Sequence, residues 1–301
     1  IKGIGNFGTR FTPFASAPRY IYAKPAAYSD LLFRTEDDVN LTYQEFEGKV
    51  VEPMFYVPTL PLILLNGTDG IGVGFKSTIL PRSLENMFKL VRATLEGKRV
   101  SKDWYKPSWH DFRGTVEFQE DSWVVKGLAT FDGKKVHIEE LPISWDLKGY
   151  NKKLQSLKDV GKIQKFHDFS EDEIFKFDVW LTDEELAKGE ETILRDLGLV
   201  EKLSENLTCF DENNAVREYN KVEDIFSDYY KIKIKYMKLR IKSEIARLLK
   251  EESDLKEIYD FIQEVIKGTV VLKGKKKAEV EAILKTKGYI IIDKLVSLPL
   301  Y

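Results

Sequence analysis

The segment SAPRYIY, at residues 16–22, places an arginine directly before a tyrosine. A tyrosine hydroxyl ordinarily ionises near pH 10, so only about 0.1% of it is phenolate at neutral pH. A neighbouring guanidinium such as that of Arg19 favours the phenolate and can also bind a phosphate group. An activated Tyr20 could attack a nucleic-acid phosphodiester and expel a sugar hydroxyl. That step exchanges one phosphodiester for another, so the strand can be resealed.

Residue types alone do not select this tyrosine, because the chain has 14 tyrosines and most tyrosines are packing residues. Tyr22 is the nearest alternative. The histidines, His110, His137 and His167, are far apart and share no metal-ligand spacing. The single cysteine, Cys209, excludes an internal disulfide and a cysteine-based zinc site. A hydrolytic or zinc enzyme therefore has no support in the sequence.

Gly3, Gly5 and Gly8 match the pattern G-x-G-x-x-G, which is known from dinucleotide-binding sites. Such a site needs a strand before the glycines, a helix opening among them and an acid about 20 positions later. The residues that follow, 9–13, read TRFTP and cannot form the first turns of a packed helix. The pattern does not indicate a nucleotide site.

A second glycine cluster, NGTDGIGVGFKS at 66–77, resembles a phosphate-binding P-loop. That motif needs glycine, lysine and a hydroxyl residue in direct succession, and here Phe75 separates Gly74 from Lys76. So many glycines still indicate unusual dihedral angles or a close approach to another molecule. The alternative is a tight structural turn.

The composition is that of an ordinary globular chain, with 301 residues, 43% hydrophobic and 32% charged. No apolar run reaches the roughly 20 residues needed to cross a bilayer. The net charge of −2 is unevenly distributed: residues 1–29 carry four basic residues and no acid, and residues 231–250 carry eight against Glu244. This asymmetry is typical of a protein that contacts phosphate groups with selected faces. For residues 231–250 the alternative is that the basic residues simply form a solvated surface.

Local patterns predict the elements that must position these residues. Prolines at 13, 18, 25, 53 and 58 prevent one long helix in the first 60 residues. TLPLILLNG at 59–67 suggests a buried strand or tight core segment, and residues 80–98 a helix capped by Ser83. SWVVKGLATF at 122–131 predicts a strand, joined to the next strand by a hairpin at Asp132-Gly133.

Further along, TDEELAKGEETILRDLGL at 182–199 predicts one capped helix. After residue 220 apolar residues recur every three or four positions, which predicts a heptad-like helix of about 40 residues. The alternating KIKIK at 231–235 would by itself favour a strand.

Three motifs in fixed order carry a family resemblance. GNFGTR, SAPRYIY and EPMFYVPTLPLILLNGTDGIGVGFKSTILP resemble the DNA breakage-reunion core of type IIA DNA topoisomerases, in both sequence and spacing. The resemblance continues through HIEELP and YNKVEDIFSDYYKIKIKYMKLR to the final LVSLPLY, so it covers essentially the whole chain.

The resemblance implies that Tyr20 is the nucleophile, forming a 5′-phosphotyrosyl intermediate, with Arg19 as its phosphate-holding partner. Ile71 matches an isoleucine that wedges between base pairs and bends the duplex, at a cost in unstacking that wider contacts recover. The other DNA contacts expected on this basis are Asn6, Phe7, Arg10, Lys24 and Lys76.

The implied fold is α+β and multidomain. It comprises the C-terminal part of a winged-helix domain at 1–60, an α/β tower domain at 61–215, and a long coiled-coil arm with a helical C-gate, incomplete, at 216–301. Two copies would form a homodimeric cleavage core on double-stranded DNA. Mg²⁺ and ATP would bind outside this chain, on an ATPase/TOPRIM subunit or domain, and we expect no metal ligand and no membrane partner here.

Those upstream parts are missing, so we expect a fragment of an ATP-hydrolysing isomerase. It looks most like the medium subunit of a tailed-phage topoisomerase, and is also similar to the gyrase A subunit and the eukaryotic core. It would work with DNA inside the cell, in the host bacterial cytoplasm if phage or in the nucleus if eukaryotic. One alternative is a non-catalytic DNA-bending protein that uses the basic turn and the Ile71 wedge. Another is a structural coiled-coil dimer without salt-dependent DNA binding.

Overall fold

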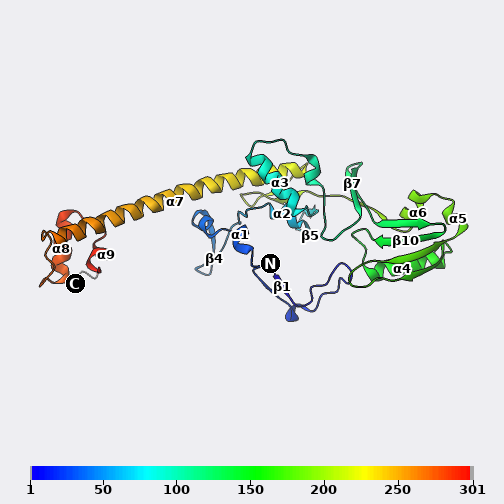
Figure 1. The fold of residues 1–301 in the computed structure, drawn as a ribbon, viewed down its shortest axis with the longest axis horizontal. Helices are drawn as coiled ribbons and strands as arrows, with labels where there is room; N and C mark the ends of the chain where they lie inside the picture. The colour runs from blue at the N-terminus through cyan, green and yellow to red at the C-terminus, as the bar shows by residue number, and fades with distance from the viewer. Residues whose placement is uncertain (1, 299–301) are drawn as a thin grey trace. The chain divides into compact units, whose positions relative to one another are not determined.

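The computed structural model of the chain describes residues 2–298, and Figure 1 labels their helices and strands. These residues form two compact units. One contains residues 2–35 together with Thr42–Lys233, and the other contains Glu36–Leu41 together with residues 234–298. The finer division into three domains, at residues 60 and 215, stays a prediction.

The first 60 residues contain only short elements, as their prolines require. Strand β1 (Lys2–Ile4) pairs antiparallel with β2 (Tyr22–Lys24), and the 3₁₀ turn η1 (Pro18–Tyr20) lies just before β2. The elements that follow are α1 (Ser29–Leu32), η2 (Thr35–Asn40) and the hairpin of β3 (Tyr43–Phe46) with β4 (Lys49–Pro53).

The segment at 59–67 contains a short helix, so the strand interpretation is wrong. The alternative of a tight core segment ended by glycine is confirmed, since Leu64 is buried and Gly67 ends the helix. Helix α2 (Leu62–Asn66) starts after Pro61 and ends at Gly67, whose φ of +68° is costly for other residues. A Cβ on Gly67 would lie 2.5 Å from the Ile79 carbonyl oxygen. This glycine leads directly into the hairpin of β5 (Thr68–Ile71) and β6 (Lys76–Ile79).

Helix α3 (Leu84–Leu95) follows Ser83, which takes the N-cap position without a side-chain cap bond. Its core-facing residues pack with α2, the 3₁₀ turn η3 (Lys102–Tyr105) and the first turns of α7 (Val222–Ile266). The most buried apolar residues of this core are Leu64, Ile79, Met87, Leu90, Tyr105, Tyr219, Val222, Ile225 and Phe226.

Two antiparallel sheets form the centre of the chain. The three-stranded sheet has the order β13 (Val200–Leu203), β8 (Ser122–Lys126), β7 (Thr115–Gln119). The four-stranded sheet has the order β11 (Ile163–Asp168), β12 (Phe177–Leu181), β10 (Lys135–Glu140), β9 (Leu128–Asp132). The hairpin at Asp132-Gly133 is confirmed, since Gly133 has φ +58° and joins β9 to β10.

The single strand predicted at 122–131 is instead two strands of different sheets. β8 and β9 are divided at Gly127, where the backbone crosses close to the bulged end of β10. A Cβ at this position would lie 2.3 Å from the Glu140 carbonyl oxygen, so no other residue fits without a shift. Apolar residues lie on both sides of the break, which is why the pattern did not reveal it.

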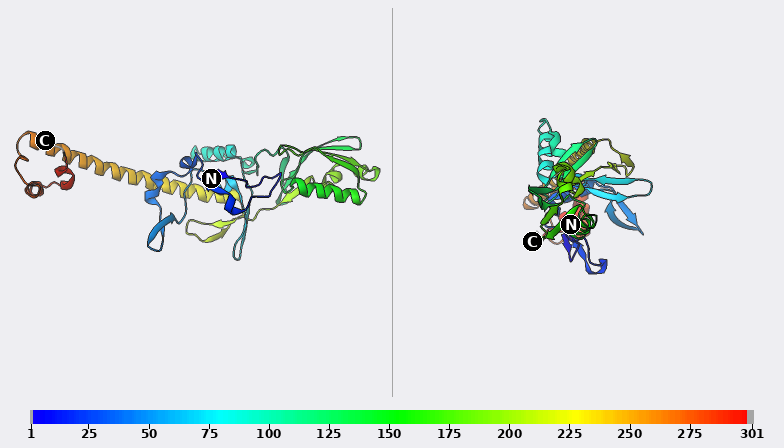
Figure 2. Two further views of the ribbon diagram at one scale, coloured as in Figure 1. Left: turned by 90° about the horizontal axis from the view of Figure 1, so that it is seen from below. Right: turned by 90° about the vertical axis from the view of Figure 1, so that its right-hand side faces the viewer.

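Helix α4 (Leu147–Asp159) runs along one face of the four-stranded sheet, as Figure 2 shows in green. Its buried face packs on inward residues of β10, β11 and β12 to form the largest core, which includes Val136, Ile138, Tyr150, Leu154, Leu157, Ile163, Phe177, Val179 and Leu181. The helix predicted at 182–199 is broken into α5 (Asp183–Leu186) and α6 (Glu190–Asp196) at Gly189, which has φ +83°.

After the hairpin of β14 (Thr208–Phe210) and β15 (Val216–Glu218), the long predicted helix is confirmed as α7, with 45 residues. It contains the KIKIK segment, so the strand alternative there is wrong. Phe261, near its end, packs with α8 (Lys277–Lys287) and α9 (Ile292–Val296) around Leu284 and Leu295. The end of the LVSLPLY segment lies outside the described residues.

A buried ion pair joins the segment before α3 to the segment after β13. Arg82 is 2% exposed and its two terminal nitrogens each lie 2.7 Å from a carboxylate oxygen of Glu205. The same carboxylate accepts bonds from the Leu80 amide (2.8 Å) and the Trp123 indole (3.0 Å). Removing one partner of such a pair leaves a buried charge without compensation.

We expect Arg82→Ala to lower the free energy of unfolding by about 3–5 kcal/mol, because the Glu205 carboxylate would stay buried without its cation. Urea unfolding of the variant and the wild type measures the difference. The control is Arg195→Ala, which removes an exposed i,i+4 pair with Glu191 and should cost less than about 1 kcal/mol. Equal effects of the two substitutions would contradict the importance of the buried pair.

Candidate functional site

The first glycine cluster shapes a long loop between β1 and β2. Asn6 closes this loop: its backbone oxygen accepts a bond from the Ser16 amide (2.9 Å), and its side chain accepts one from the Gly8 amide (2.8 Å) and donates one to the Phe14 carbonyl (3.3 Å). Gly8 has φ +77°, and a Cβ there would lie 2.9 Å from the Pro13 backbone. Figure 1 shows the loop in dark blue, running out toward α4 and back.

Tyr20 and Arg19 lie on the returning arm of this loop, in η1. Pro18 begins the turn, so its fixed φ starts the 3₁₀ conformation that carries both side chains. The guanidinium carbon of Arg19 lies 4.8 Å from the centre of the Tyr20 ring, a cation–π contact. Tyr20 is 64% exposed and Tyr22, in β2, is 67% exposed, so accessibility does not distinguish the two.

Several other candidate nucleophiles are weakened by their surroundings. Burial raises the pKa of Tyr105 and of Tyr219 to about 12, and it raises the pKa of Tyr150 and of Tyr229 further. Burial also raises the pKa of the Cys209 thiol above its usual value. A raised pKa makes the nucleophilic anion scarcer, so these groups are better suited to packing than to attack.

The second glycine cluster forms the tip of the β5–β6 hairpin, where Ile71 pairs across the strands with Lys76. The Gly72 amide donates to the Phe75 carbonyl (2.8 Å), and a Cβ on Gly72 would lie 2.6 Å from the Phe75 ring. The tip exposes two apolar side chains, with Ile71 at 89% and Val73 at 102% exposure.

Sequence reasoning selected Ile71 and missed Val73. The available signal was the position of Val73 among glycines, which leave an apolar side chain few neighbours to pack against. The two exposed apolar side chains do not pack within this chain. On a narrow glycine-rich backbone they are better suited to insertion into another molecule.

The other predicted contact residues differ in their surroundings. Lys24 in β2 and Lys76 in β6 are exposed, and Phe7 is 48% exposed with its ring against Gly3. Arg10 is held at the far end of the loop by Glu140, with 2.9 Å between Nη1 and the carboxylate oxygen. The structure therefore does not gather all the predicted residues into one patch, and their roles in DNA binding stay predictions.

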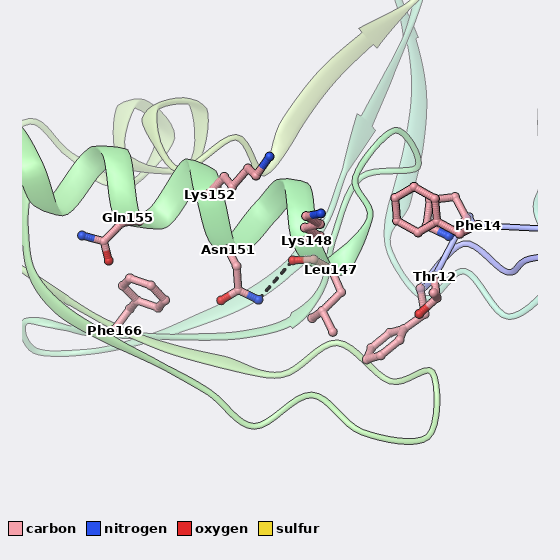
Figure 3. Close-up of a pocket in the computed structure, with 10 residues that line it drawn as sticks. Thr12, Phe14, Leu147, Lys148, Asn151, Lys152, Gln155 and Phe166 are labelled. Atoms are coloured by element: carbon pink, nitrogen blue, oxygen red, sulfur yellow. Dashed lines mark hydrogen bonds between the residues drawn. The ribbon is translucent and has the colours of Figure 1, made fainter.

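A cavity of about 590 Å³ lies beside the loop (Figure 3). One wall is formed by loop residues 11–14, and the other by Leu147, Lys148, Asn151, Lys152, Gln155 and Phe166 from α4 and β11. The Asn151 amide donates to the Leu147 carbonyl (3.1 Å) and to Asp168 (2.7 Å), and the Lys148 ammonium lies 5.7 Å from the centre of the Phe14 ring. The far end of the loop thus lies beside α4, with the cavity between them.

Across residues 2–298, no group of three or more His, Cys, Asp or Glu side chains is placed to hold a metal ion. The resemblance places Mg²⁺ on an ATPase/TOPRIM subunit or domain outside this chain, so no step of the reaction is assigned to that ion here. Within the same residues, no helix is long and apolar enough to span a bilayer.

Comparison with known proteins identifies clear relatives. The family model for the A subunits of DNA gyrase and topoisomerase IV matches residues 1–301. The DNA topoisomerase medium subunit of enterobacteria phage T4 is 31% identical over 313 residues, covering 100% of this chain and 69% of that protein. Mouse DNA topoisomerase 2-alpha is 31% identical over 304 residues, covering 96% of this chain and 20% of the mouse protein.

The fold is also similar to a solved structure. The DNA-binding, cleavage and re-ligation domain of Plasmodium falciparum topoisomerase II aligns with a TM-score of 0.83 at 27% identity, covering 98% of this chain and 41% of that one. The chain thus spans about a fifth of the length of the eukaryotic topoisomerases it matches and about two thirds of the phage protein.

We expect Cys209 in the native chain to react with a thiolate-selective reagent at pH 8 at least about tenfold more slowly than in the urea-unfolded chain, because the thiolate is the reacting species and burial raises the thiol pKa. The native rate should climb as pH rises toward the raised pKa. Timed alkylation read by mass spectrometry measures both rates. Equal rates in the two states would show that the thiol is not protected.

Proposed function

The chain belongs to the family of DNA gyrase and topoisomerase IV A subunits, and we propose that it is the DNA-cleaving and resealing part of an ATP-dependent type IIA topoisomerase. The observation that carries this proposal is an accessible tyrosine with a guanidinium stacked on its ring, at the end of a closed loop, in a chain that matches the family over residues 1–301.

In the proposed reaction the Tyr20 hydroxyl oxygen attacks the phosphorus of a DNA phosphodiester. A bond forms between the tyrosine oxygen and the 5′ phosphate, and the bond from phosphorus to the 3′ oxygen breaks. The proton lost by the tyrosine is matched by the one gained at the released 3′ hydroxyl. Attack of that hydroxyl on the phosphotyrosine reverses the reaction and reseals the strand.

Arg19 is proposed to hold the phosphate under attack. Its guanidinium is always charged and presents several N–H donors, which suit the non-bridging phosphate oxygens. The Arg19 contact with the Tyr20 ring keeps this charge beside the attacking group before DNA arrives. Negative charge that develops on the phosphate and on the phenolic oxygen would be stabilised by the same cation.

The β5–β6 hairpin is proposed to bend the duplex. Ile71 would insert between base pairs, with exposed Val73 beside it and Lys76 near the phosphates. Unstacking one step costs a few kcal/mol, which the larger contact surface of bent DNA offsets.

The finer architecture is part of the same proposal. The short elements up to residue 60 would complete a winged-helix domain, the two sheets with α4 would form the tower, and α7 with α8 and α9 would form a coiled-coil arm and dimer gate. Two copies would each cut one strand. The name of the phage T4 relative, a medium subunit, supports a separate partner protein that carries the ATP and Mg²⁺ sites.

We expect the complete enzyme containing this chain, with its partner subunit, Mg²⁺ and plasmid DNA, to leave protein covalently attached to 5′ DNA ends when the reaction is stopped with detergent. Tyr20→Phe should abolish the adduct, because it removes the attacking oxygen and leaves the ring. The adduct is measured by labelled-DNA gel electrophoresis.

Tyr22→Phe is the matched control, since Tyr22 is equally exposed two positions away and should leave the adduct intact. An adduct that persists in Tyr20→Phe and disappears in Tyr22→Phe would reassign the nucleophile. DNA that is bent without adduct in any variant would favour the architectural alternative.

We expect Ile71→Ala to reduce the bend of a short duplex measured by end-to-end energy transfer, and to lower the cleavage rate by about tenfold or more, because a methyl group does not fill the space of an unstacked step. Val73→Ala measures how much the neighbouring Val73 side chain contributes to the bend and to the cleavage rate. If Ile71→Ala bends and cleaves DNA as the wild type does, the hairpin is not the wedge.

A further inference from the structure

Arg10 lies at the far end of the loop that carries Tyr20 and is held there by several groups at once. Its Nη1 donates to a Glu140 carboxylate oxygen at 2.9 Å, and its Nη2 donates to the carbonyls of Leu141 and Pro142 (3.1 Å to Pro142). Its guanidinium carbon also lies 4.8 Å from the centre of the Phe175 ring. We call this arrangement of Arg10 on Glu140 and the two carbonyls the Arg10 clamp.

The acceptor side of the clamp is buried and fixed. The Glu140 side chain is 5% exposed and accepts further bonds from the amides of Leu141 (3.0 Å) and Arg113 (3.3 Å). Only Arg10 and Arg113 bring full positive charge to this carboxylate among the described residues, and Arg113 lies at 3.8 Å and is half exposed. A buried carboxylate needs such a partner, so the clamp has a strong preference for being closed.

The loop end packs on the same domain beside the clamp. The Phe11 ring lies 5.3 Å from the Phe175 ring, and the Phe11 carbonyl accepts a bond from the Leu147 amide at the start of α4 (3.3 Å). Residues 11–14 then form one wall of the cavity seen in Figure 3. These contacts fix the position of the far end of the loop. Arg10, at that end, is 130 residues away from Glu140 in the sequence.

The loop transmits this position to Tyr20 through its own bonds. Asn6 ties the outgoing arm to Ser16 on the returning arm, and the Tyr20 amide donates to the Ala17 carbonyl (2.9 Å). A Cβ on Gly5 would lie 3.0 Å from the Tyr20 carbonyl oxygen, so the two arms also touch directly at the base. The loop therefore has little freedom to move Tyr20 while Arg10 is held.

We propose that Arg10 and Glu140 are positioning residues, which set the position of the Tyr20 hydroxyl for attack by docking the loop against β10 and the start of α4. This inference rests on the proposed function and differs from the sequence-based prediction that Arg10 contacts a DNA phosphate. A misplacement of about 1 Å at a reacting group can lower a rate by about 100-fold without weakening substrate binding.

The two roles for Arg10 give opposite results in the complete enzyme. If Arg10 binds a DNA phosphate, Arg10→Gln would weaken DNA binding and reduce the slope of its salt dependence by about one, and Glu140→Gln would not reproduce this. A positioning role predicts that Arg10→Gln and Glu140→Gln have the same effect: unchanged DNA affinity and salt slope, with the rate of adduct formation at saturating DNA lowered at least about tenfold.

The experiment measures DNA affinity at several salt concentrations, single-turnover adduct formation, and amide hydrogen exchange of residues 8–16 by mass spectrometry. We expect both single variants to exchange faster in this segment and the double variant to be no slower in cleavage than the worse single variant, because both residues act through one contact. Arg10→Lys keeps the charge and should recover part of the rate. Arg195→Gln, which removes an exposed pair on α6, is the control and should behave as the wild type.

Faster exchange with an unchanged cleavage rate would overturn the positioning role and leave the clamp as a purely structural contact. A lower salt slope in Arg10→Gln alone would overturn it in favour of the phosphate contact. If the wild type itself forms no adduct, the proposed function fails and the positioning role fails with it. Wild-type adduct with unaffected variants overturns only the inference.

Discussion

Burial of the Glu140 carboxylate is the electrostatic constraint on which the arrangement of the N-terminal loop depends. A carboxylate that is 5% exposed requires a cation, and the chain supplies Arg10 from a loop that has almost no other structure of its own. The loop contains only a 3₁₀ turn and a two-stranded pairing at its base. The exposed Tyr20 therefore lies on a segment that is held at its base by strand pairing and at its far end by one ion pair.

In the β5–β6 hairpin, too, exposed side chains are supported by a buried ion pair. Glycines and a tight turn keep the side chains of Ile71 and Val73 exposed to water. In this chain these apolar groups therefore gain no free energy from burial. The buried pair of Arg82 with Glu205 fixes the segment that follows β6. Well-packed parts of the molecule therefore support the exposed tip of the hairpin and the exposed Tyr20 near the base of the loop, and these are the surfaces proposed to meet DNA.

Sequence reasoning succeeded where the signal is local. The Asp132-Gly133 hairpin and the long helix α7 follow from turn chemistry and from apolar spacing, and the order of three motifs was enough to identify the family. It failed at Gly127 and in the strand interpretation of 59–67, because apolar patterns do not show where a sheet ends or whether a short run is helical. For the site, it selected the exposed Tyr20 and Ile71, but the partner of Arg10 is 130 residues away and no local pattern predicts it.

Gly127, at the junction of the two sheets, is connected to the N-terminal loop through Glu140. The backbone of Glu140 passes so close to Gly127 that a Cβ would lie 2.3 Å from its carbonyl oxygen, while the side chain of Glu140 holds Arg10. A side chain at 127 would displace the residue that anchors the loop. The glycine is thus a steric condition for an electrostatic contact: a missing Cβ at the sheet junction leaves room for the backbone whose side chain holds the loop.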